Sequence, residues 1–268
     1  MTRSTVSELH VYPVKSLGGI ALSESEVLQR GIRWDRHWML VDASGRFLTQ
    51  RQLPRMALVG TGVDGDGLTL AAAGMPALRV PLEASAEPVN VTVWRDTVLA
   101  HDVSAEADRW LSSFLGVACR IVRFPAEASR PVDTAYGQAG DETAFSDGFP
   151  LLLTGEASLA DLNRRLTRPL SMARFRPNLV VAGAAPFAED AWRRIRVGGL
   201  TLRVVKPCSR CIMTTVDPAR GEVDGDEPLR TLASFRQRGN KVYFGQNVIP
   251  DGEGTIRVGD RVEVLEAV

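Results

Sequence analysis

Short alternating strands separated by tight turns are the feature that most limits how this chain can fold. Apolar and polar residues alternate over Val89–Trp94, and Arg95–Asp96 turns the chain back into Thr97–Ala100. A second turn, Asp64–Gly67, is rich in glycine and aspartate and leads into Leu68–Leu70. Closely spaced strands with turn signals between them are typical of barrels and sandwiches. The sequence therefore predicts a β-barrel-like unit in the first hundred residues.

Helical spacing occurs in only a few places. Ser104 is a good N-cap for a segment that carries apolar residues on one face and ends at Gly116. Leucines at helical spacing indicate another helix over Leu159–Leu166. Between the two helices, Glu127–Phe145 is aperiodic and contains proline, glycine and aspartate, as expected of a boundary loop or an active-site lid. The predicted fold class is α+β, mainly β, with flanking helices.

The second half also contains strand patterns. Arg194–Val197 and Leu200–Val205 are expected to pair across a Gly-Gly turn, and Gly254–Leu265 is predicted to form another hairpin. The stretch Cys208–Cys211 would then lie in a loop directly after a strand.

Composition excludes several classes of function. Lys and Arg together number 32, as do Asp and Glu, so the net charge is zero. Nucleic acids and acidic membrane surfaces both favour a basic excess, so neither is an expected partner. No apolar run approaches the roughly 20 residues of a spanning helix, and the first ten residues do not resemble a signal peptide. Three cysteines fit a reducing compartment, and the expected location is cytoplasmic.

The sequence Cys208-Ser209-Arg210-Cys211 contains two of the three cysteines. Closely spaced thiols indicate metal, redox or covalent chemistry, and the cation of Arg210 favours the thiolate form. A structural zinc site would need four ligands, and a thioredoxin-like pair would need a helix N-terminus in a βαβ unit. An inert, partly buried pair is the remaining alternative. The other cysteine and the histidines have no paired spacing that would complete a zinc site: Cys119, His10, His37 and His101.

Three basic clusters are candidate anion sites. Lys15-Ser16 is followed by two glycines after a strand, which suits a phosphate, although a solvated turn would look the same. Arg174–Asn178 precedes a buried strand, where a guanidinium and an amide could bind an oxyanion or form a surface salt bridge. The third cluster, Arg33–Trp38, could equally be the charged start of a strand.

Taken together, these pieces resemble the MOSC family, and more closely its bacterial and mitochondrial amidoxime-reducing proteins. The matching motifs run in order across nearly the whole chain: Tyr12–Ser16, Arg36–Asp42, Thr49–Arg55, Ser146–Leu153, Glu156–Asn163, Phe175–Asn178, Cys208–Pro218 and Phe244–Gln246.

The resemblance implies an N-terminal MOSC β-barrel domain over residues 1–122 and a β-barrel-type MOSC domain over residues 123–268. It also implies a molybdenum–pyranopterin cofactor, with Cys211 as the metal ligand and Cys208 as a flanking cysteine. The residues implied to hold the cofactor and its phosphate are Lys15, Ser16, Arg36, Arg176, Asn178, Ser209 and Arg210.

The implied activity is reduction of the N–O bond of a small N-hydroxylated substrate. Asp147 would donate a proton or contact the substrate, and the alternative is an aspartate that only caps a helix or loop. An iron–sulfur cluster needs several thiolates, and no cysteine follows Cys211, so electrons are expected from a separate ferredoxin- or cytochrome-like protein. The alternative is a carrier of sulfur or of the molybdenum cofactor, with a persulfide on Cys211.

Overall fold

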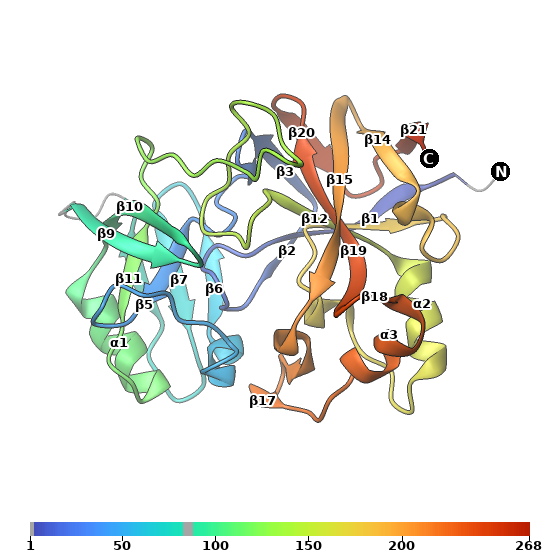
Figure 1. Ribbon diagram of the computed structural model, residues 1–268. Coiled ribbons are helices and arrows are strands. Elements are labelled where there is room, and N and C mark those ends of the chain that lie inside the picture. Colours follow the sequence, from blue (N-terminus) through green and yellow to red (C-terminus); the bar gives the residue numbers. More distant parts are fainter. Residues whose placement is uncertain (1–2, 83–87) are drawn as a thin grey trace.

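A nine-stranded sheet dominates the half of the molecule on the right of Figure 1. The computed structural model describes residues 3–82 and 88–268. Leu9, Leu153, Leu202 and other buried residues on these strands form the largest apolar cluster. In spatial order the strands are β2 (Ile20–Leu22), β1 (Thr5–Val11), β13 (Leu179–Ala182), β12 (Leu151–Gly155), β19 (Lys241–Pro250), β15 (Leu200–Arg210), β14 (Trp192–Val197) and β21 (Val262–Ala267), with β18 (Gln237–Arg238) also paired to β19.

The other half contains two smaller sheets and one helix. Helix α1 (Ala105–Leu115) begins at the Ser104 cap and ends at Gly116 with a positive φ of 73°, as the sequence predicts. Its buried face, which includes Leu111, packs into a second apolar cluster. The strands are β5 (Trp38–Val41), β11 (Arg120–Arg123), β10 (Asp96–Asp102) and β9 (Pro88–Val93) in one sheet, and β6 (Gly60–Val63), β7 (Gly67–Ala71) and β8 (Leu78–Pro81) in the other.

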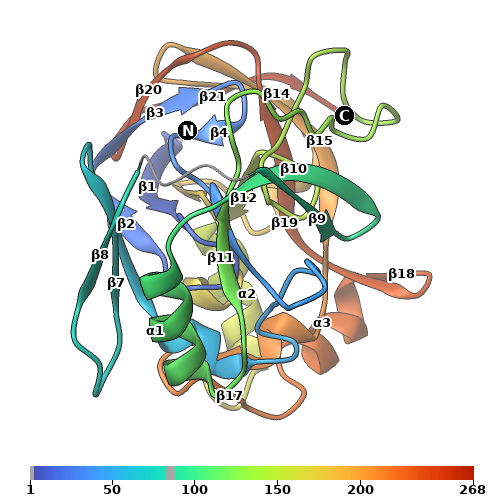
Figure 2. The ribbon, with the colours of Figure 1, turned by 90° about the vertical axis from the view of Figure 1, so that its left-hand side faces the viewer.

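Two of the first strands of the chain, β1 and β3 (Glu24–Leu28), pair with strands from its second half. Strand β1 pairs antiparallel with β13, and β3 pairs with both β4 (Gly31–Ile32) and β20 (Gly254–Arg257). In Figures 1 and 2 the blue N-terminal strands accordingly lie beside yellow and red segments. The predicted division between residues 122 and 123 stays a prediction.

Helices cover the lower part of the large sheet. Helix α2 (Glu156–Arg165) and helix α3 (Leu229–Arg236) contribute Leu162 and Leu232 to an apolar cluster with Phe175 and Phe244, whose rings stack 4.1 Å apart. The predicted class is confirmed: the described chain is mostly strand, with three α-helices. The remaining short elements are β16 (Val216–Asp217), β17 (Glu222–Val223) and 3-10 helices over Pro54–Leu58, Met172–Arg174, Ala188–Asp190 and Ile212–Thr215.

Two expectations about the second half are wrong. The alternating segment Gly254–Leu265 does not form a hairpin, because β20 pairs with β3 while β21 pairs with β14. Alternation shows which face of a strand is buried, but it does not select the partner strand. The stretch from Cys208 to Arg210 is also not in a loop, as expected, but in strand β15. The strand continues through Pro207 because register shifts let it pair with β19 beyond the proline.

The aperiodic segment Glu127–Phe145 contains no helix and no named strand, as expected of a loop. Buried Arg130 fixes the end of this segment by donating to the carbonyl oxygens of Ala144 (2.9 Å) and Ser146 (2.6 Å). The loop therefore delivers the next residue, Asp147, to a defined place. In the described part of the chain, none of the helices combines the length and the apolar character that crossing a membrane requires.

Candidate functional site

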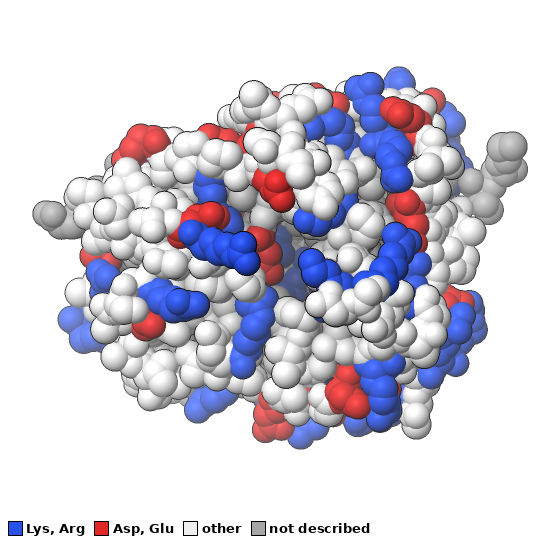
Figure 3. All heavy atoms as spheres, viewed as in Figure 1, with Lys and Arg blue, Asp and Glu red and all other residues white. Residues whose placement is uncertain are grey.

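A pocket lies between the two halves of the molecule, where segments from distant parts of the sequence meet. Figure 3 shows a hollow at the centre of this face, with Lys and Arg side chains gathered around it. Every site residue predicted from the sequence lines this pocket: Lys15, Ser16, Arg36, Asp147, Arg176, Asn178, Cys208, Ser209, Arg210 and Cys211.

Cys211 lies at the start of the short 3-10 helix that follows β15. Its sulfur accepts from Arg51, whose Nη2 and Nε lie 3.3 and 3.4 Å from Sγ. A guanidinium at this distance stabilises negative charge on the sulfur, and the thiolate is the form that binds metals or attacks electrophiles. The arrangement therefore favours Cys211 as a ligand or nucleophile.

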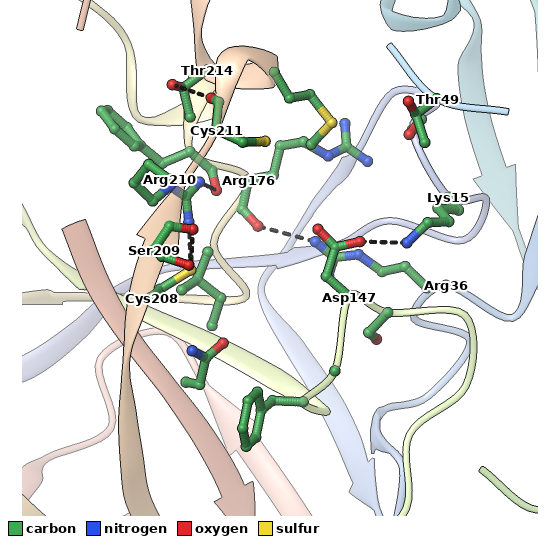
Figure 4. Close-up of a pocket in the computed structure, with 18 of the residues that line it drawn as sticks. Lys15, Arg36, Thr49, Asp147, Arg176, Cys208, Ser209, Arg210, Cys211 and Thr214 are labelled. Carbon is green, nitrogen blue, oxygen red and sulfur yellow. Dashed lines mark hydrogen bonds and ion pairs between the residues drawn. The ribbon is translucent and has the colours of Figure 1, made fainter. Parts of the chain in front are cut away.

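Cys208 has a different environment. It is part of β15, and its sulfur accepts from Arg210 Nη1 at 2.9 Å. Arg210 also donates to the carbonyl oxygen of Phe175 (2.6 Å), so this cation is held between the strand and the loop before β13. The two cysteines are free thiols with separate guanidinium partners, and Figure 4 shows Cys208 on the strand and Cys211 beyond its end.

Lys15 and Asp147 form the charged centre of the pocket. Lys15 Nζ donates to Asp147 Oδ1 at 2.5 Å and to the carbonyl oxygen of Phe145 at 2.8 Å. Burial lowers the pKa of Lys15 to about 8, although the carboxylate of Asp147 opposes the shift. Burial alone would raise the pKa of Asp147, but the Lys15 ammonium and the Arg51 guanidinium outweigh it and hold that pKa well below its ordinary value. Asp147 is therefore a carboxylate at neutral pH.

Arg36 is fixed by partners from both halves. Its guanidinium donates to buried Asp35 (2.5 Å), to the carbonyl oxygen of Arg176 (3.1 Å) and to Asn178 Oδ1 (3.2 Å). The same group lies 4.4 Å from the centre of the Tyr12 ring. Such a guanidinium is positioned before any ligand arrives.

Arg176 brings a second guanidinium onto Tyr12, 4.2 Å from the ring centre. Its Nη1 donates to the carbonyl oxygen of Leu17 (2.7 Å), whereas Nη2 is buried with no hydrogen-bond partner among the described residues. Burial, with the nearby Arg36 cation, lowers the pKa of Arg176 to about 10. An unpaired buried guanidinium beside a second cation is suited to an anionic ligand.

Asn178 lines the pocket, but its polar atoms are used by the protein. Its Oδ1 accepts from the backbone N–H of Leu152 (3.0 Å) as well as from Arg36, and its Nδ2 donates to the carbonyl oxygen of His10 (3.2 Å). The side chain therefore joins β1, β12 and the loop that carries Arg36.

Backbone strain is concentrated at the pocket. Ser16, Arg36 and Arg176 have φ angles of 67°, 48° and 54°, in the left-handed region that non-glycine residues seldom adopt. Each such residue costs about 1–3 kcal/mol, and residues of this kind cluster at functional sites. The strain supports a binding role for the basic clusters over the surface-turn alternatives.

Arg51 lines the pocket, but sequence reasoning missed it. It belongs to the Thr49–Arg55 motif, but 160 residues separate it from Cys211, and no local pattern pairs the two. Trp94 was missed for the same reason. It lies at the tip of a hairpin in a separate sheet, and its Nε1 donates to Asp147 Oδ1 at 3.2 Å.

The donor set is poor for a metal held by protein ligands alone. Over residues 3–82 and 88–268, no three His, Cys, Asp or Glu side chains are grouped so that they could hold a metal ion. A structural zinc site would need four such ligands. A pocket thiol such as Cys211, with Lys and Arg around it, instead suits a metal whose other ligands belong to an anionic cofactor.

Comparison with known proteins gives matches over almost the whole chain. The family described as "MOSC N-terminal beta barrel domain" matches residues 3–118, and the "MOSC domain" family matches residues 140–263. The chain is 38% identical to mitochondrial amidoxime-reducing component 1 of Mus musculus, covering 97% of this chain and 82% of the relative. The Homo sapiens protein of that name is also 38% identical, over 97% of this chain and 83% of its own length. Component 2 of Bos taurus is 36% identical, with coverages of 96% and 82%.

These names correct one expectation. The sequence predicts a cytoplasmic location, yet the relatives are named as mitochondrial proteins, so the comparison contradicts the prediction. Composition and cysteine count do not distinguish one reducing compartment from another.

The two matched families and the similarity over almost the whole chain lead to one conclusion: the protein belongs to the MOSC-domain family of amidoxime-reducing components.

Proposed function

We propose that the protein is a molybdenum-cofactor-dependent reductase of small N-hydroxylated compounds. The observation that carries this proposal is Cys211, a thiol that lines the pocket, accepts from the Arg51 guanidinium and lies among further cations. The names of the relatives supply the substrate class, because they are called amidoxime-reducing components.

The residues present fit a molybdenum–pyranopterin cofactor. Cys211 would ligate the metal, and buried Arg176, with its unpaired Nη2, would bind the anionic end. Arg210 Nε is likewise buried without a partner among the described residues. When bound, the cofactor supplies the two-electron redox chemistry. The remaining residues proposed to hold it are Lys15, Ser16, Arg36, Asn178 and Ser209, with Asn178 acting through Arg36.

Asp147 is better suited to contacting the substrate than to donating a proton. A carboxylate accepts hydrogen bonds, and an amidoxime offers N–H and O–H donors. The acid beside it is Lys15, whose pKa of about 8 leaves Nζ mostly protonated at neutral pH but able to release a proton. The Lys15–Asp147 pair would therefore orient the substrate and hold one of the two protons that reduction of the N–O bond to an amidine and water consumes.

Electrons are proposed to come from a separate ferredoxin- or cytochrome-like protein. The chain has three cysteines, and two of them lie in the pocket. An iron–sulfur cluster of its own would need about four thiolates. The protein would thus bind the small substrate and the donor at different times or on different surfaces.

The first experiment measures molybdenum content and turnover together. Protein purified from a molybdenum-sufficient host should contain near-stoichiometric molybdenum and reduce benzamidoxime to benzamidine with a chemical reductant. Cys211→Ala should abolish this activity, and Cys208→Ala should reduce it less. Normal turnover by Cys211→Ala would exclude the proposed ligand, and equal loss in both variants would favour dithiol chemistry.

The carrier function remains the second candidate, because the environment of Cys211 would also stabilise a persulfide. Metal-free protein that carries sulfane sulfur on Cys211 and lacks turnover would support a carrier instead of a reductase.

A further inference from the structure

The tip of the β9–β10 hairpin carries an exposed tryptophan in a strained conformation. Trp94 is the first residue of a two-residue turn, and its φ is 57°. Hairpin turns of this length favour glycine at a position with positive φ. Trp94 is 39% exposed, so part of its surface is open to solvent although the backbone is strained.

Trp94 touches the site although it belongs to the sheet of the other half. Its Nε1 donates to Asp147 Oδ1 (3.2 Å), and the Arg51 guanidinium lies 4.6 Å from the centre of its ring. The Phe47 ring, 5.1 Å away, supports it from its own half. Figure 1 shows the β9–β10 tip pointing towards the large sheet. The indole therefore contacts Asp147, the partner of Lys15, and Arg51, the partner of Cys211.

The ring and the carboxylate together define a recognition surface. An exposed indole binds flat apolar groups by stacking, and the half-exposed carboxylate of Asp147 accepts N–H or O–H donors. Lys15 holds Asp147 in its charged form, and the Arg51 cation and the indole N–H add to this effect and help to fix its position. A planar molecule with an N–H or O–H donor at one end could stack on the indole and donate to the carboxylate at the same time.

We propose that Trp94 is a specificity-determining residue that forms an aromatic wall at the mouth of the pocket. The proposal rests on the proposed reductase function and narrows its substrate class. The preferred substrates are aromatic or heteroaromatic N-hydroxylated compounds whose flat ring stacks on Trp94 while an adjacent N–H donates to Asp147.

The test compares an aromatic with an aliphatic amidoxime. Calorimetry with the cofactor-loaded protein measures the Kd of benzamidoxime and of acetamidoxime, and steady-state assays measure the KM of each. Trp94→Gly removes the ring and relieves the strained φ, whereas Trp94→Phe keeps a ring without the N–H. Leu265→Ala removes an apolar side chain that is also 39% exposed, from strand β21.

Trp94→Gly should weaken benzamidoxime binding about tenfold more than acetamidoxime binding, without lowering the melting temperature. Trp94→Phe should retain most of the preference for the aromatic compound, and Leu265→Ala should leave it unchanged. Equal effects of Trp94→Gly on both compounds, or no effect on either, would overturn the aromatic wall. So would a wild-type protein that does not prefer benzamidoxime.

Binding and turnover separate this inference from the function on which it rests. If the preference depends on Trp94 but neither compound is reduced, the aromatic wall stands and the reductase proposal fails. If both compounds are reduced and Trp94→Gly leaves their Kd ratio unchanged, the reductase stands and the aromatic wall fails.

Discussion

The Arg51 guanidinium lies 3.3 Å from the sulfur of Cys211, across the boundary between the two halves of the molecule. The small sheets and their loops thus supply the cation, while β15 of the large sheet leads to the thiol. Neither half contains the complete site, which explains why the pocket forms between them.

Removing this cation should slow the reactions of Cys211. In cofactor-free protein carrying Cys208→Ser, the variant Arg51→Ala should be alkylated by iodoacetamide at pH 7 roughly threefold more slowly than its parent, because the sulfur loses both of its contacts with the guanidinium. Mass spectrometry of the modified peptide follows the rate. Arg210→Ala is the matched control, since Arg210 contacts the sulfur of Cys208. Equal rates with and without Arg51 would contradict the proposed role.

Neutralising Asp147 should destabilise the protein through Lys15. Asp147→Asn leaves a buried ammonium without its anion, and we expect a loss of about 1–2 kcal/mol at pH 7, moderated by solvent because Asp147 is half-exposed. Urea unfolding of both proteins measures the difference.

The same pair predicts a pH dependence. The folded pKa of Asp147 lies below its ordinary value of 3.8, so its contribution is present above pH 3.8 and lost as pH falls below it. The stability difference between wild type and Asp147→Asn should therefore shrink in acid. Lys15 has the opposite effect at alkaline pH, because its pKa is about 8 in the folded protein and 10.5 in the unfolded chain. Between these two values the unfolded chain binds more protons, so the cost of burying the charged ammonium fades as the pH rises from about 8 to 10.5. A difference that stays constant from pH 7 to pH 3 would exclude the ion pair as its source.

Arg176→Met should separate binding from stability. Cofactor content, measured as molybdenum per protein, should fall about tenfold because the anion loses a guanidinium partner. The free energy of unfolding of the cofactor-free protein should change by less than about 1 kcal/mol, because removal of a buried unpaired charge offsets the lost bond to Leu17. A large loss of stability would show that Arg176 mainly supports the fold.

Asn178→Ala should destabilise the fold itself. The change leaves the N–H of Leu152 and the carbonyl of His10 without their side-chain partner, at a cost of about 2–3 kcal/mol. Chemical denaturation measures this loss. Asn247→Ala is the control. Among the described residues, the Asn247 side chain makes one hydrogen bond, from Nδ2 to the carbonyl oxygen of Lys206, so this substitution should cost about 1 kcal/mol. If the two variants were equally stable, Asn178 would not be the structural link described above.

The sequence predicts local features well and distant pairings poorly. The Ser104 cap, the Asp64–Gly67 turn and the β14–β15 hairpin are each encoded by adjacent residues, and each is found in the structure. The Gly254–Leu265 pattern is equally clear, yet its strands pair elsewhere, because the partners of a strand depend on the packing of the whole sheet.

The same distinction applies to the site. Cysteines, arginines and lysines can be recognised by residue type and by resemblance, and those predicted line one pocket. The partner of each is set by tertiary contacts. Arg51 beside Cys211, and Trp94 beside Asp147, could not be inferred from spacing along the chain.

The pairing of β1 with β13 has a consequence for how the protein is made. Thr5, opposite Ala182, leaves the ribosome long before its partner strand exists, so the first strand must wait while most of the chain is synthesised. Until then, β1 exposes an unpaired edge that invites association with other chains. Circular permutation that moves Thr5–Ile32 behind Val268 would place these strands after all of their partners, and it should raise the yield of soluble protein from a cell-free translation without chaperones.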